Sequence, residues 1–105
     1  MNKPLEYYFA KKEIIEHVIF NKYTIDECGI IRNKKTGKMI VRKKRNYNII
    51  TVRNDSDKPR SIRVARAIES TFLGPPPSPT HTADHKNQIS LDDTLVNIRW
   101  LCKSG

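Results

Sequence analysis

One apolar helical stripe, closed by a glycine and a run of prolines, divides this chain into two unequal parts. Val64, Ile68 and Phe72 recur at the i, i+4 and i+8 spacing of one helix face. Gly74 stands where such a helix would end, and the proline-rich residues after it cannot continue it. We therefore predict an amphipathic helix over Ile62–Leu73, followed by a stiff extended spacer. Three polar residues lie off the predicted apolar face: Arg63, Arg66 and Glu69.

The segment before this helix favours β structure. The stretch Asn48–Arg53 is rich in β-branched residues, and Asn54–Asp57 is a cluster of turn formers. Thr36 and Gly37 supply another turn between short apolar pairs. From Tyr23 onward we predict a small antiparallel meander of about three strands. Residues 1–22 are undecided, because their apolar spacing suits a helix for part of its length and a strand near its end.

Beyond the proline spacer, two short segments have strand character. His81–His85 and Ile98–Cys102 bracket a polar loop. The expected fold class is α+β, a small β meander and one helix followed by this pair of strands. We expect one compact unit made of residues 1–22, a basic meander with its helix at 23–73, a spacer at 74–80 and a core at 81–105. A docking site for a proline-reading module is the alternative for the spacer.

The charge balance predicts a polyanionic partner. Twenty Lys and Arg residues stand against eleven Asp and Glu, which gives a net charge of +9 and a pI near 9.8. Such an excess is the electrostatic footprint of nucleic-acid binding. A run without any acid is expected to contact phosphates: Arg32, Lys34, Lys35, Lys38, Arg42, Lys43, Lys44 and Arg45. Arg63 and Arg66 are further candidates, and a nuclear-localisation signal is the competing interpretation of residues 42–45.

Several other classes of function find no support in the sequence. Cys28 and Cys102 lie far apart without metal-ligand spacing, and we predict both to be buried small hydrophobes in a reducing setting. No apolar run approaches the ~20 residues that span a bilayer, so an intracellular protein in nucleus or cytoplasm is expected. Because no glycine-rich phosphate loop or nucleophile elbow occurs, no small-molecule substrate is predicted.

The pair Asp84 and His85 carries the sharpest chemical signal. A carboxylate is a hard oxygen ligand for Mg²⁺ or a similar ion, and an imidazole is the most common general base. Neighbours on a regular strand point to opposite faces, so one site uses both only if the strand end twists. Taken alone, the dipeptide favours a surface acid and an ordinary histidine over a catalytic pair.

The surrounding residues resemble the HNH endonuclease family. The stretch Thr82–Asn87, followed by Asp92–Trp100, is similar to the branch whose pattern runs Asp-His, a polar loop, and then Asn-Leu/Ile-Arg-Trp. The helix residues and the Gly-Pro exit at Thr71–Pro76 resemble the segment that precedes this core. Residues 23–38 look like the β-rich nuclease-associated module upstream in phage, intron-borne and giant-virus homing-type members. The resemblance covers Tyr23 to Gly105.

This resemblance implies roles for particular residues. His85 would be the general base that activates water against a phosphodiester of double-stranded DNA, and Asp84 a ligand of a divalent ion, Mg²⁺ or Mn²⁺. Asn97 would fix the loop that carries the histidine. The family's core is a ββα-metal fold whose final helix supplies the last ligand, and that position falls beyond Gly105. We therefore expect a core lacking its final helix, as a fragment of an endonuclease or a degenerate copy.

Other candidates receive structural interpretations. Asp92 and Asp93 are predicted to form a turn or a helix N-cap, and Trp100 to pack in the core. His81 lies in the strand of Asp84, where a structural or exposed role competes with a place near the scissile phosphate; His17 has no partner in sequence. A non-catalytic DNA-binding module that retains an HNH remnant is the main rival function. An RNA-binding protein of ribosomal type fits the charge but not the Asp-His and Asn pattern.

Overall fold

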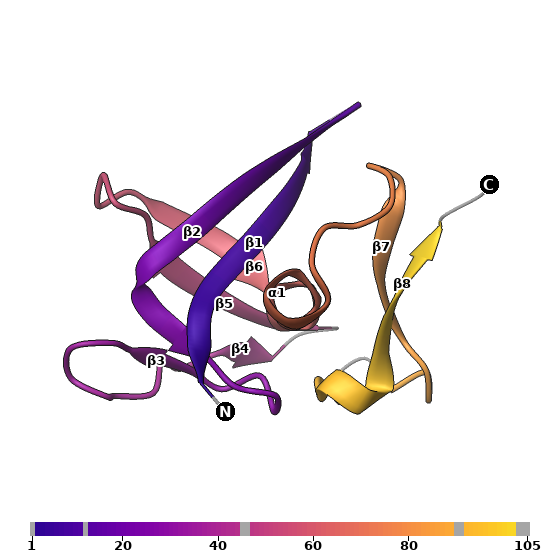
Figure 1. Ribbon diagram of the computed structural model, residues 1–105. Helices are drawn as coiled ribbons and strands as arrows, with labels where there is room; N and C mark the ends of the chain where they lie inside the picture. Colours follow the sequence, from indigo (N-terminus) through magenta and orange to yellow (C-terminus); the bar gives the residue numbers. More distant parts are fainter. Residues whose placement is uncertain (1, 12, 45–46, 90–91, 103–105) are drawn as a thin grey trace.

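The structure is a computed structural model that describes residues 2–11, 13–44, 47–89 and 92–102 (Figure 1). Its α+β architecture, with antiparallel strands and one α-helix in the described residues, confirms the predicted fold class. The elements are β1 (Lys3–Lys11), β2 (Ile14–Ile25), β3 (Ile31–Asn33), β4 (Lys43–Lys44), β5 (Asn48–Arg53), β6 (Pro59–Arg63), α1 (Val64–Ile68), a π-helical turn η1 (Glu69–Leu73), β7 (His81–His85), a 3₁₀ turn η2 (Leu95–Asn97) and β8 (Ile98–Cys102).

The undecided N-terminal segment is a long antiparallel hairpin. Strands β1 and β2 pair with Leu5 opposite Phe20 and Tyr8 opposite His17, and the register shifts between Pro4 and Leu5. Leu5 and Phe20 are fully buried, so the strand interpretation, not the helical one, places the apolar residues in the core. Because β2 continues to Ile25 and pairs with β3, the hairpin is continuous with the meander that follows.

The second sheet has the order β4-β5-β6 and leads directly into α1. Ile62, predicted to begin the helix, belongs to β6 and is buried between the exposed Ser61 and Arg63, which is the alternation of a strand. Helix α1 begins two residues later than predicted, at Val64. Strand β6 was not predicted because the apolar periodicity of the helix extends back into it.

The second half of the predicted helix is π-helical, and this turn changes which side chains are buried. Glu69 was predicted to lie off the apolar face, but its side chain is fully buried. A π turn is wider than an α turn, so it shifts the helical stripe. Ser70 and Thr71 are buried with it and accept hydrogen bonds from the backbone N–H groups of Tyr8 (3.1 Å) and Glu6 (3.1 Å). These two hydrogen bonds hold the π-helical turn η1 against strand β1.

The hydrophobic core lies where the two three-stranded sheets meet α1 (Figure 1). Its largest fully buried members are Phe20, Leu5, Ile25, Ile31, Ile62 and Ile68. Gly29 adjoins this core with φ of 82°, and a Cβ there would lie 2.8 Å from the Val64 side chain. Glycine is therefore required both by conformation and by space.

The hairpin of β7 and β8 spans the residues predicted for the two C-terminal strands, and its register confirms their pairing. In Figure 1 it stands on the other side of α1 from the β1–β2 hairpin. Cys28 is exposed, which corrects the prediction that it is buried; the Cys102 side chain lies outside the described residues. In the part of the chain that the structure describes, no helix has the length and apolar character needed to cross a membrane.

Candidate active site at the β7–β8 hairpin

The end of β7 places Asp84 and His85 beside one small pocket. The pocket has a volume of about 270 Å³ and is lined by Tyr47, Ala83, Asp84, His85 and Gln88. In the antiparallel register, Asp84 lies opposite Arg99 and His85 opposite Ile98. Because His85 is the last residue of the strand, the chain leaves the regular pleat there, and both neighbouring side chains reach the same pocket.

A buried carboxylate holds His85. Nε2 of His85 lies 2.7 Å from Oδ1 of Asp93, whose side chain is only 1% exposed. The other oxygen of Asp93 accepts a hydrogen bond from Nδ2 of Asn48 at 2.6 Å. Since an ionised carboxylate only accepts, Nε2 carries the hydrogen and donates it. In the neutral ring the lone pair is then on Nδ1, which has no hydrogen-bond partner among the described residues.

Asn97 ties together both ends of the loop that follows His85. Its Nδ2 donates to Oδ1 of Asn87 (3.0 Å) and to the backbone carbonyl of Asp92 (2.9 Å). Its Oδ1 accepts from the backbone N–H of Asn87 at 3.1 Å, and its own carbonyl accepts from the N–H of Lys86 at 2.7 Å. Asn97 therefore braces the backbone on which both His85 and Asp93 depend, the geometry that its expected role requires.

Asp84 offers one carboxylate at the pocket, and that group is already paired. Its Oδ2 accepts from Nε of Arg99 at 2.9 Å, with side chains that are 30% and 56% exposed. Within the described ranges, no three His, Cys, Asp or Glu side chains gather as a metal-binding group. A hard divalent ion that keeps most of its waters fits one such carboxylate, because Mg²⁺ commonly takes one or two protein ligands and completes its shell with water and phosphate.

A second acid, Glu69, lies buried beneath this hairpin. Neither carboxyl oxygen has a hydrogen-bond partner among the described residues, and burial raises the pKa of Glu69 to about 8. The charge of Arg66 opposes this rise, and the negative charge of Asp84 adds to it. Glu69 is thus mainly a neutral carboxylic acid at pH 7. A neutral carboxylic acid costs much less to bury between η1 and the β7–β8 hairpin than an unpaired carboxylate would.

The predicted phosphate contacts fall into two groups. Lys34, Lys35, Lys38 and Lys43 are exposed. Three of the predicted arginines already bind oxygen atoms of the protein. Arg32 pairs with Asp26 at 3.3 Å, and Nη2 of Arg42 donates to the carbonyl of Gly29 at 2.8 Å. Nε of Arg66 donates to the carbonyl of Tyr8 at 2.6 Å. Arg63 is exposed. The Lys44 side chain and Arg45 lie outside the described residues.

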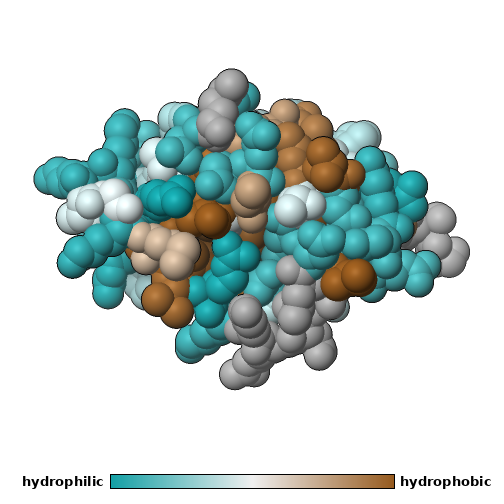
Figure 2. Space-filling view, turned by 90° about the horizontal axis from the view of Figure 1, so that it is seen from below, coloured by the Kyte–Doolittle hydropathy of each residue, from teal (hydrophilic) through white to brown (hydrophobic). Residues whose placement is uncertain are grey.

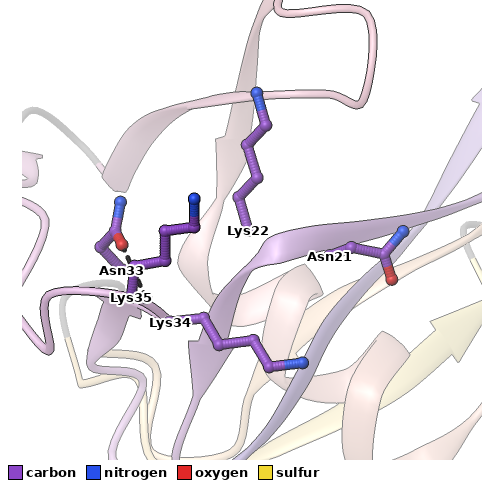
Figure 3. Close-up of a pocket in the computed structure, with 5 residues that line it drawn as sticks. All are labelled: Asn21, Lys22, Asn33, Lys34 and Lys35. Atoms are coloured by element: carbon purple, nitrogen blue, oxygen red, sulfur yellow. Dashed lines mark hydrogen bonds between the residues drawn. The ribbon is translucent and has the colours of Figure 1, made fainter.

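The exposed lysines that follow β3 border another pocket, with a volume of about 430 Å³. Its lining residues are Asn21, Lys22, Asn33, Lys34 and Lys35. Figure 3 shows the amines of Lys22 and Lys35 extending to the same side and Lys34 extending away from them. The pocket is lined by residues of β2, of β3 and of the loop after β3, and Figure 1 shows β3 on the opposite side of α1 from β7 and β8. The face in Figure 2 is mainly hydrophilic, with apolar patches.

Asp93 and Asn48 are the site residues that the sequence did not reveal. Asp93 was predicted to be a turn or N-cap residue, but Thr94 precedes η2 without a side-chain cap and Asp93 is buried against His85. Asp92, by contrast, stays in the loop and accepts from Nδ2 of Asn87 at 2.8 Å. Asn48 is 45 residues from Asp93 in sequence, so no local pattern links them.

The other two histidines have structural partners. Nδ1 of His81 lies 2.8 Å from the Ser78 hydroxyl, at the exit of the spacer. His17 lies 2.7 Å from a carboxylate oxygen of Glu6 and stacks on the ring of Tyr8, with centroids 4.3 Å apart. Trp100 faces the Arg66 guanidinium, which lies 5.0 Å from its ring centroid.

Comparison with known proteins supports the fold of this site. No protein-family model matches the chain, and no curated protein matches it. A solved structure of the HNH homing endonuclease I-HmuI, described for its DNA binding and cleavage, superimposes with a TM-score of 0.67 at 21% sequence identity. The match covers 77% of this chain and 47% of that chain, so the chain spans about half the length of that protein. At this identity the likeness shows a shared fold.

Proposed function

We propose that this chain is an HNH-type DNA endonuclease, or a fragment of one, that hydrolyses a phosphodiester at the pocket of Asp84 and His85. The observation that carries the proposal is the 2.7 Å hydrogen bond between His85 and the buried Asp93. It leaves Nδ1 as the acceptor nitrogen of a ring that lines the same pocket as Asp84. The fold shared with a DNA-cleaving homing endonuclease and the charge of +9 also support it.

In this proposal His85 removes a proton from the attacking water. Asp93 keeps the ring oriented and favours the imidazolium that forms, because its charge is close and buried. Asn97 acts through the loop: it holds the backbone of residues 86, 87 and 92, and so fixes the distance between His85 and Asp93. Asn97 is therefore a positioning residue, and His85 is the catalytic one.

A divalent ion, Mg²⁺ or Mn²⁺, is proposed to bind Asp84, with water and DNA phosphate oxygens completing its shell. When bound, such an ion would stabilise negative charge on the phosphate oxygens. Arg99 competes for the same carboxylate, since its Nε lies 2.9 Å from Asp84 Oδ2. We expect weak ion binding and slow cutting, because the described residues supply one carboxylate to this position.

The partner is proposed to be double-stranded DNA, contacted through the exposed lysines 34, 35, 38 and 43. A non-catalytic DNA-binding module is the alternative. It is favoured by the ion pair that occupies Asp84 and by the single carboxylate at the pocket. Both proposals place the protein where DNA is present, inside a cell.

Plasmid nicking separates the two proposals. Supercoiled DNA is incubated with the protein in Mg²⁺, in Mn²⁺ and in EDTA, and the nicked circle is quantified over time. The endonuclease proposal expects nicked circles that accumulate in either metal and not in EDTA, with linear DNA later or absent. A gel shift that retards DNA, with no nicking in either metal, would establish the binding module instead.

A further inference from the structure

A second pocket lies on the other side of Ala83 from the Asp84–His85 pocket, and it is lined by positive charge. It has a volume of about 260 Å³, and its walls are Tyr7, Phe9 and Ala10 from β1, Thr82 and Ala83 from β7, and Arg63 and Arg66. No acidic side chain of the described residues lines it. Because Ala83 borders both pockets, the two form neighbouring compartments along β7.

Arg63 stands at the boundary between the two compartments. Its guanidinium lies 4.3 Å from the ring centroid of Tyr47, and Tyr47 lines the Asp84–His85 pocket. Its backbone N–H donates to the hydroxyl of Tyr7 at 3.3 Å, which anchors the residue where β6 meets α1. Stacking on an aromatic ring limits the freedom of the side chain, so less order is lost when the guanidinium binds an anion.

Arg63 also differs from the other described arginines in having its donors available. Each of the others donates to, or pairs with, an oxygen of the protein: Arg32 with Asp26, Arg42 with Gly29, Arg53 with Asp57, Arg60 with Glu16, Arg66 with Tyr8 and Arg99 with Asp84. In the described structure the guanidinium of Arg63 makes no hydrogen bond or ion pair, and its residue is exposed. Burial is the main cause that lowers the pKa of Arg66, and the charge of Arg63 adds to it, since the two cations line the same pocket and repel each other. An anion between them would relieve that repulsion.

We propose that Arg63 and the pocket beside it bind the backbone phosphate next to the one at Asp84 and His85, so that a nucleic-acid strand passes both compartments along β7. This rests on the proposed function, which places the scissile phosphate at His85. It assigns the strand a path across Arg63, apart from the lysine pocket by β3. Arginine is suited to this task because its planar fork donates two hydrogen bonds to one phosphate.

Nucleotides with one or two phosphates test the subsite without any need for cleavage. Thymidine 3′,5′-bisphosphate and thymidine 5′-monophosphate are titrated in Mg²⁺ buffer into the wild type, Arg63→Gln, Arg63→Lys and the matched control Lys58→Gln, an exposed lysine outside the proposed DNA contacts. Binding is followed by NMR shifts of the Arg63 and His85 side-chain N–H groups. The wild type and K58Q should prefer the bisphosphate by about tenfold, as expected for one charge-assisted contact. R63Q should lose that preference and R63K should keep part of it.

Each other outcome overturns the subsite. A bisphosphate preference that survives in R63Q, or one that disappears in K58Q, would place the second phosphate elsewhere. Failure of the wild type to bind either nucleotide would also overturn it, as would R63Q-sensitive binding of a polyglutamate peptide without nucleotide binding. Thermal unfolding of R63Q should match that of the wild type, because the side chain is exposed. If R63Q unfolds at a lower temperature, the subsite is tested by the bisphosphate preference of R63K alone.

Plasmid nicking distinguishes the failure of this subsite from the failure of the proposed function. If the wild type nicks DNA and R63Q slows nicking no more than K58Q does, the nuclease stands and the subsite falls. If the nucleotide preferences are as expected and no metal supports nicking, the subsite stands and the endonuclease proposal falls.

Discussion

Replacing Glu69 by glutamine should make this protein more stable at neutral and alkaline pH. Glu69 is fully buried without a hydrogen-bond partner among the described residues, and its pKa is raised by burial to about 8. In the unfolded chain the same carboxyl has its ordinary pKa of 4.5. Because the folded-state pKa lies above the unfolded one, the stability that protonation contributes is fully present below about pH 4.5. It declines as the pH rises towards 8.

The size of the effect follows from the separation of these two pKa values. Each pKa unit corresponds to about 1.4 kcal/mol, so between pH 4.5 and pH 7 the wild type should lose roughly 3 kcal/mol that a glutamine variant keeps. The gap should widen to roughly 4–5 kcal/mol at pH 9, above the folded-state value. Glutamine has nearly the same shape and no charge, so packing against η1 and β7 is retained.

Urea denaturation followed by the fluorescence of Trp100 measures the difference directly. Unfolding free energies of the wild type, Glu69→Gln and the exposed control Glu13→Gln are compared at pH 4.5, 7 and 9. Comparison with the wild type cancels the contributions of all other groups, which the two proteins share. Parallel pH dependences for the wild type and E69Q would refute the argument, because they would mean that Glu69 titrates alike in both states.

The remaining predictions concern the site and its support. Asp93→Asn should slow nicking by about tenfold to a hundredfold, less than the roughly 10²–10⁴-fold that a whole general base contributes, because His85 remains in place. Gel-shift affinity for DNA should stay within about twofold, and an unchanged rate would show that His85 needs no such partner. Arg99→Ala should lower the Mn²⁺ concentration for half-maximal nicking by up to about fivefold, because an exposed ion pair contributes at most about 1 kcal/mol. A higher Mn²⁺ concentration for half-maximal nicking would show that Arg99 does not compete for Asp84. Gly29→Ala should destabilise the fold by about 1–3 kcal/mol in thermal unfolding. The φ of 82° disfavours a side chain, and the added Cβ would lie 2.8 Å from the Val64 side chain. A melting temperature equal to that of the wild type would contradict this prediction.

Local patterns predicted the elements of the C-terminal part well. The strands His81–His85 and Ile98–Cys102 were predicted with the bounds that the structure has, because a proline-rich spacer and a polar loop set them off from the rest of the chain. The N-terminal hairpin was not decided, since in β1 and β2 the same residues satisfy helical and strand spacing, and only the pairing of Leu5 with Phe20 distinguishes them. Tertiary contacts settle such cases.

The site was predicted in part. The sequence indicated Asp84, His85 and Asn97, and the structure brings all three to one loop and hairpin. Asp93 was misinterpreted as a turn residue because a buried acid and a turn acid look alike in sequence. What distinguishes it is contact with His85 and with Asn48, a residue of a different sheet. The burial of Glu69 was missed for a related reason: a single π turn rotates it into the interior, and periodicity assumes a regular helix.

The most direct test of the account is the single-turnover nicking rate of His85→Ala at saturating protein, with DNA affinity measured on the same preparation. If His85 is the general base, the rate should fall at least a hundredfold while the dissociation constant changes by less than about threefold. The control His17→Ala, at a histidine paired with Glu6 on the β1–β2 hairpin, should cut at the wild-type rate. Nicking by H85A at the wild-type rate, with binding intact, would contradict the assignment of catalysis to this pocket.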